Sequence, residues 1–131
     1  MKALILLTMI FLHIVDDFYL QGILAQMKQK KWWEEQTTDK QYKHDYMAAL
    51  IIHGFSWSFM VHLPFTGLIV LLDRFEDVSV LALSLTVHAA VHALIDHFKA
   101  NKHVINLIED QMFHVTQVWV IFATTVIALY G

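Results

Sequence analysis

The stretch Ala3–Leu24, ALILLTMIFLHIVDDFYLQGIL, decides the fold class of this chain. It is an almost unbroken apolar run, and an α-helix needs ~20 such residues to cross a bilayer. Only His13, Asp16 and Asp17 interrupt it with ionisable groups. A secretory signal peptide has a shorter apolar core and a small-residue cleavage site, neither of which this stretch has. We therefore expect a retained membrane-spanning helix.

The rest of the chain repeats this pattern three times. Of its 131 residues, 57% are hydrophobic and only 16% are charged, so it has too little polar surface to enclose a soluble globule. The single Pro64 predicts a kink within the second apolar stretch. We predict an all-α fold with a single domain over residues 1–131. The predicted fold is an integral membrane four-helix bundle with spans at about residues 3–24, 47–72, 78–98 and 104–130.

One long polar segment, residues 26–46, separates the first two spans. Its composition predicts a short amphipathic segment, with Trp32 and Trp33 at the membrane interface. Five lysines lie in this first connection and two in the third, whereas the opposite side has only Lys2 and Arg74. By the positive-inside rule, we expect both lysine-rich connections in the cytoplasm and both termini outside, in a bacterial inner membrane.

Composition also excludes several classes of function. The chain has no cysteine, so it can form neither disulfides nor thiolate metal sites. A formal net charge of −3 gives no electrostatic case for binding nucleic acid. Nine histidines, in contrast, are more than the packing of so short a chain needs.

Three short sequence motifs, called here the His–Asp strings, contain the candidate functional residues. Each places a histidine and an aspartate four residues apart, so that on a helix the two side chains share one face. The first and third spans run toward the cytoplasm and the fourth runs away from it. The reversed order of the last string therefore puts every aspartate nearer the cytoplasm and every histidine deeper. At ~1.5 Å per residue, all three pairs and His53 fall in the cytoplasmic half of the bundle. The pairs are His13 with Asp17, His92 with Asp96, and Asp110 with His114.

Histidine and carboxylate groups without cysteine form a ligand set for zinc, manganese or ferrous iron. We predict a site for one or two divalent transition-metal ions, with zinc as the first choice. Its predicted ligands are His13, Asp17, His53, His92, Asp96, Asp110 and His114. With Asp17 or Asp110 as general base and Lys99 as an anion contact, such a site would suit a metal-dependent hydrolase. Its substrate would be an amphiphilic or lipid-linked ester or phosphoester at the cytoplasmic leaflet.

Two other functions stay open. The cluster could act as a relay in a carrier or channel for metal ions or protons, which would need a homo-oligomer because four helices are few for transport. We interpret His62 as a packing histidine and expect no matching polar path beyond it in the outer half of the bundle. The absence of such a path would favour a dead-end site over a transport path. Alternatively, the chain could be a non-enzymatic phage or bacterial accessory protein. It would then bind a protein partner through residues 28–43, and the His–Asp pairs would only join helices.

The combined motifs resemble a known family over nearly the whole chain. They are His13-x-x-x-Asp17-Phe18-x-x-Gln21, a lysine-rich segment, His53, His92-x-x-x-Asp96-x-x-Lys99 and Asp110-Gln111-x-x-His114. This pattern resembles the small bacterial and phage membrane proteins called domain of unknown function 3307, and its first motif fits Asp17 rather than Asp16. The resemblance implies a polytopic membrane protein with these polar positions as its hallmark. It implies no reaction.

Overall fold

The structure, a computed structural model, describes residues 1–130, with side chains through residue 128. Every regular element in that range is helical, which confirms the all-α prediction. The chain begins with α1 (Lys2–Ile14), which continues directly into a π-helical segment, η1 (Val15–Leu20). The other long helices are α4 (Asp45–Leu71), α5 (Val78–His97) and α6 (Leu107–Tyr130). A second π-helical segment, η4 (Phe98–Lys102), extends α5.

The connection between η1 and α4 differs in detail from the predicted amphipathic segment. It contains two short helices, α2 (Leu24–Met27) and α3 (Lys30–Gln36), and a 3-10 turn, η2 (Lys40–Tyr42). Gln29 separates α2 from α3 because its backbone is extended, with φ −96° and ψ 120°. A further 3-10 turn, η3 (Phe75–Asp77), joins α4 to α5.

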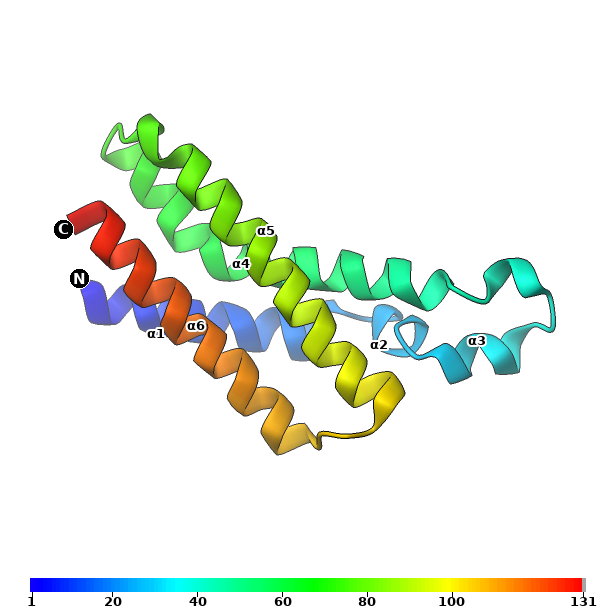
Figure 1. The fold of residues 1–131 in the computed structure, drawn as a ribbon. Helices are drawn as coiled ribbons and strands as arrows, with labels where there is room; N and C mark the ends of the chain where they lie inside the picture. Colours follow the sequence, from blue (N-terminus) through cyan, green and yellow to red (C-terminus); the bar gives the residue numbers. More distant parts are fainter. Residues whose placement is uncertain (131) are drawn as a thin grey trace.

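The long helices pack side by side with their connections divided between two ends (Figure 1). The N-terminus, the end of α6 and the α4–α5 turn lie at one end, called here the terminal end. The loop end carries α2, α3 and the α5–α6 connection. Helix α4, which contains Pro64, changes direction along its length. Four segments are long and apolar enough to cross a membrane: Lys2–Leu20, Lys40–Leu71, Phe75–Lys102 and Leu107–Ala128.

The interior is divided along the bundle axis. Its half toward the terminal end holds the apolar core, and its half toward the loop end holds most of the buried polar side chains. Large apolar side chains face outward, among them Leu7, Ile51 and Leu83, each more than half exposed. A polar interior beneath an apolar exterior is the distribution expected for helices in lipid. The core residues are Ile5, Met9, Trp57, Val61, Phe65, Ile69, Val118 and Ile121.

Gly54 allows the closest approach between α4 and α5. A Cβ added to it would lie 2.6 Å from the carbonyl oxygen of Ala89 and 3.1 Å from the Cβ of Ala93. These neighbours belong to a helix backbone and a short side chain, so neither can move away cheaply. The contact sits beside His53 and sets how closely α4 and α5 bring their polar residues together.

We expect Gly54→Ala to lower the midpoint of thermal unfolding in detergent, because the new methyl group must push α5 away. The matched control is Gly67→Ala in the same helix, where a Cβ would meet no atom within 4 Å. Alanine is the better helix former by ~1 kcal/mol, so the control should match or exceed the native midpoint. Equal midpoints for the two variants would contradict this account of α4–α5 packing.

Candidate metal centre

The three His–Asp strings come together in the half of the bundle toward the loop end. They lie on three separate segments, α1 with η1, α5 and α6, and His53 of α4 joins them. Every one of these side chains belongs to a residue that is at most 5% exposed. The predicted convergence on one layer is therefore present in the fold. Its members are His13, Asp17, His53, His92, Asp96, Asp110 and His114.

A first set of ligand atoms surrounds Nε2 of His53. This nitrogen lies 3.2 Å from Nε2 of His92, 3.3 Å from Oδ1 of Asp17 and 3.4 Å from Oδ2 of Asp96. A ring nitrogen carries at most one hydrogen, so it cannot satisfy three such neighbours by hydrogen bonding. Tetrahedral ligands at the ~2.0–2.1 Å bond lengths of zinc would lie ~3.3 Å from one another. The observed separations therefore suit a shared cation.

A second set of ligand atoms lies around His114. Its Nε2 is 3.3 Å from Oδ1 of Asp96 and 3.3 Å from Oδ1 of Asp110. These two atoms are buried and lie 3.3 Å apart, yet neither forms a hydrogen bond with any described residue. Such orphaned atoms are rare in proteins and call for an explanation such as a bound ion.

Three groups of side chains bring ligand atoms within 4.8 Å of one another and could hold a metal ion. Asp96 belongs to two of these groups, with Oδ2 facing His53 and Oδ1 facing His114. A carboxylate placed in this way can bridge two ions, as in two-metal sites. The groups are Asp17 with His92 and His114, His53 with His92 and Asp96, and Asp96 with Asp110 and His114.

The charges around the cluster also favour a divalent cation. Two ammonium groups reach into it: Nζ of Lys28 lies 2.6 Å from Oδ2 of Asp96, and Nζ of Lys99 lies 2.6 Å from Oδ2 of Asp110. When ionised, the four buried aspartates exceed the two lysines by two negative charges. Uncompensated charge is very costly in a buried position, and one divalent ion would balance it. The four are Asp16, Asp17, Asp96 and Asp110.

His13 lies beside the ligand atoms and outside all three groups. The indole N–H of Trp57 donates to its Nδ1 at 2.8 Å, and its Nε2 lies 3.1 Å from Oε1 of Gln111. Because an indole can only donate, Nε2 of His13 carries the proton and donates to Gln111. The amide of Gln111 in turn donates to Oδ2 of Asp17 at 2.7 Å. His13 thus belongs to a chain that orients Asp17, as outer partners orient ligands in metal sites.

Sequence reasoning set Asp16 aside in favour of Asp17, because Asp16 breaks the four-residue spacing, yet both are buried beside His53. Its Oδ2 lies 3.7 Å from Nδ1 of His53, and its Oδ1 accepts a hydrogen bond from Ser56. Both Asp16 and Asp17 point inward because η1 is a wide π-helical turn, a feature often found at functional sites. The i,i+3 spacing from His13 to Asp16 could have shown it, just as the i,i+4 spacing from His53 could have shown Trp57.

Lys28 could not have been found from the sequence. It lies among the lysines of the polar segment, yet it is only 8% exposed and forms an ion pair with Asp96. Asn101 secures its backbone, since its amide donates to the carbonyl of Lys28 at 2.9 Å and accepts from the N–H of Lys30 at 2.6 Å. These two hydrogen bonds attach residues 28–30, at the start of α3, to η4, next to the ion pair between Lys28 and Asp96.

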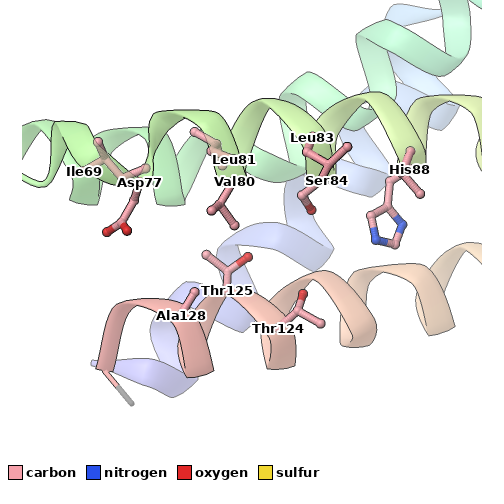
Figure 2. A pocket seen from close by; sticks show the side chains of 11 residues that line it. Ile69, Asp77, Val80, Leu81, Leu83, Ser84, His88, Thr124, Thr125 and Ala128 are labelled. Atoms are coloured by element: carbon pink, nitrogen blue, oxygen red, sulfur yellow. The ribbon is translucent and has the colours of Figure 1, made fainter.

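The expectation of no polar path beyond His62 in the outer half stays a prediction. His62 is a hydrogen-bonded interior histidine as expected, with Nδ1 donating to the carbonyl of Ser58 and Nε2 accepting from Ser84. Beside it, Ser84 and His88 line a mostly apolar cavity of about 260 Å³ between α5 and α6. Figure 2 shows these two side chains directed toward α6, where the cavity is lined by Thr124 and Thr125.

Comparison with protein-family models, curated proteins and solved structures finds no match to this chain. The resemblance to domain of unknown function 3307 therefore stays a prediction. The function has to be argued from the geometry of the buried cluster.

Proposed function

We propose that this chain is an integral membrane protein with a divalent metal centre, and that it hydrolyses amphiphilic or lipid-linked esters or phosphoesters at the cytoplasmic leaflet. One observation carries the proposal. Buried imidazole nitrogens and carboxylate oxygens lie 3.2–3.4 Å apart in sets that hydrogen bonds cannot satisfy. Zinc is the first candidate, because it accepts this mixed nitrogen and oxygen set, and manganese or iron would accept it too.

The side chains suggest a division of roles. His53, His92, His114 and Asp96 would hold one or two ions. A zinc ion lowers the pKa of bound water to ~7 and so supplies a nucleophile. Asp110 is the favoured general base, because its Oδ1 has no hydrogen-bond partner. Asp17 is the second choice, since its oxygens already face His53 and Gln111.

The placement in the membrane is also proposed. We infer a bacterial inner membrane with the loop end in the cytoplasm and both termini outside. This orientation follows from the lysines of the first and third connections, which gather at the loop end. It places the cluster near the cytoplasmic leaflet. Membership of the domain of unknown function 3307 family would agree with this arrangement.

Elemental analysis of the detergent-purified protein tests the proposal. We expect one or two equivalents of a transition metal per chain, retained on dialysis and removed by a strong chelator. Removal should lower the midpoint of thermal unfolding, because the buried carboxylates lose their counter-charge. Hydrolysis of a model phosphoester in mixed micelles should stop on chelation and return with zinc. Protein without stoichiometric metal, or His92→Ala with unchanged metal content, would contradict the metal centre.

A second candidate function has one observation in its favour. A line of polar side chains runs along α5 at every fourth residue, from the cavity between α5 and α6 to the cluster. It consists of Ser84, His88, His92 and Asp96. Such a polar line could carry protons or metal ions toward the site. Zinc uptake into proteoliposomes, abolished by His88→Ala, would favour a carrier over a hydrolase. A sealed vesicle that takes up no zinc or protons would exclude it.

A further inference from the structure

A polar pocket opens from the cluster toward the loop end. It has a volume of about 310 Å³, and its lining includes Gln21, Lys28, Asp96, Lys99 and His103. Each lysine uses one N–H on its aspartate, so two more remain for an incoming anion. One divalent ion would neutralise the aspartates, and a second would give the site a net positive charge that attracts an anion.

An apolar groove lies on another side of the same cluster, between η1 and α6. Its volume is about 590 Å³, and its outer lining includes Phe18, Ile108 and Met112, all more than half exposed. It faces the surface that we propose meets lipid. Gln111 also lines this groove, and its amide donates to the carboxylates of Asp17 and Asp110.

The pocket and the groove share no lining residue, and the buried carboxylate of Asp110 lies between them. Oδ2 of this residue accepts a hydrogen bond from Lys99, which lines the pocket, and one from Gln111, which lines the groove. Oδ1 of the same carboxylate faces His114 and the ligand atoms. Lys99 of the pocket and Gln111 of the groove thus bond to one carboxylate, so a molecule with its anionic head in the pocket and a hydrocarbon chain in the groove would have its polar junction near Asp110.

We propose that the substrate is a membrane lipid with a terminal phosphate, bound with the phosphate between Lys28 and Lys99 and one chain in the groove. Charge complementarity selects the phosphate, and the continuity of the groove with the outer surface selects a lipid. The reaction step rests on the proposed hydrolase function, and the binding step rests on the metal centre, whose ions would outweigh the charge of the four buried aspartates. In that reaction a water oxygen bonds to phosphorus and the bond from phosphorus to the lipid oxygen breaks. The proton that Asp110 takes from the water passes to the departing lipid oxygen.

Calorimetric titration of the full chain in detergent tests the binding step, on both metal-free and zinc-loaded protein. The probes are dioctanoyl phosphatidic acid, dioctanoyl phosphatidylcholine and inorganic phosphate. We expect phosphatidic acid to bind at least ~10-fold more tightly than either of the others, a difference of ~1.4 kcal/mol. Lys99→Gln and Val115→Phe should each weaken it ~10-fold, by removing a charge from the pocket and by filling the groove.

Matched controls separate these effects from misfolding. Lys102→Gln removes an exposed lysine from the same segment, and Val120→Phe enlarges an exposed residue of the same helix that lies outside the groove. Both should bind phosphatidic acid as the native chain does. Three results would overturn the proposal that a lipid phosphate binds here: equal affinity for phosphatidylcholine, tighter binding of free phosphate, or equal losses of affinity in the control variants.

Zinc content measured on the same samples distinguishes the two proposals. Stoichiometric zinc without selective phosphatidic acid binding would overturn the proposed substrate but would still support the metal centre. Selective binding by protein that cannot retain zinc would overturn both the hydrolase and the contribution of metal charge to lipid binding.

Discussion

Asp96→Asn is expected to abolish stoichiometric metal binding. The substitution keeps the shape of the side chain and removes the charge that faces both sets of ligand atoms, since Asp96 approaches His53 with one oxygen and His114 with the other. Loss of an orienting partner typically costs ~10–100-fold in metal affinity, and loss of a shared ligand should cost more. Competition with a chelating dye of known affinity measures the effect.

Two further aspartates calibrate this result. Asp16→Asn should weaken metal binding by only ~10–100-fold, because Asp16 contacts the far nitrogen of His53 rather than the ligand atoms. Asp39→Asn, on the exposed polar segment, should change nothing. A folded Asp96→Asn variant that keeps the native metal affinity would contradict this expectation. The cluster would then be a set of hydrogen bonds between helices and not a metal site.

Trp57→Ala is expected to cause the largest loss of stability of any single truncation in the bundle. Trp57 is fully buried in the apolar core, stacks on His92 with ring centroids 4.2 Å apart and donates to Nδ1 of His13. Removing a buried aromatic ring costs ~3–5 kcal/mol in measured series. The same change leaves His13 without a donor and thereby releases Gln111 and Asp17.

Trp57→Phe separates packing from orientation. It keeps most of the ring but loses the hydrogen bond, which typically contributes ~1 kcal/mol. We expect a small fall in stability together with a clear fall in metal affinity, because the chain through His13 to Asp17 is broken. Unfolding titrations in mixed micelles and metal competition measure the two effects. A Phe variant with native metal affinity would show that this chain does not orient the site.

Several features were predictable because they depend on local sequence alone. The four spans follow from the length and hydropathy of the apolar runs, and the helices in the structure begin and end within a few residues of the predicted bounds. The three His–Asp pairs follow from the i,i+4 geometry of a helix. Their convergence also followed, because chain direction and loop charge placed every pair at one depth.

Other features depend on contacts that no local pattern records. The π-helical turn turns Asp16 and Asp17 inward together, and packing against η4 buries Lys28 on Asp96. His13, predicted as a ligand, has both ring nitrogens occupied by Trp57 and Gln111. Each of these outcomes depends on which side chain of a neighbouring helix lies close enough to contact the aspartate, lysine or histidine concerned.

By itself, the sequence determined that this chain forms four apolar helices with histidines and aspartates in one layer, because hydropathy and helical spacing are properties of single segments. Only the tertiary structure decided which atoms meet. It set ligand nitrogens against carboxylates, assigned one lysine each to Asp96 and Asp110, and brought Lys99 and Gln111 to the same oxygen of Asp110. The physical reason is that such contacts depend on the rotation and separation of packed helices. Close approaches such as the one at Gly54 set that separation.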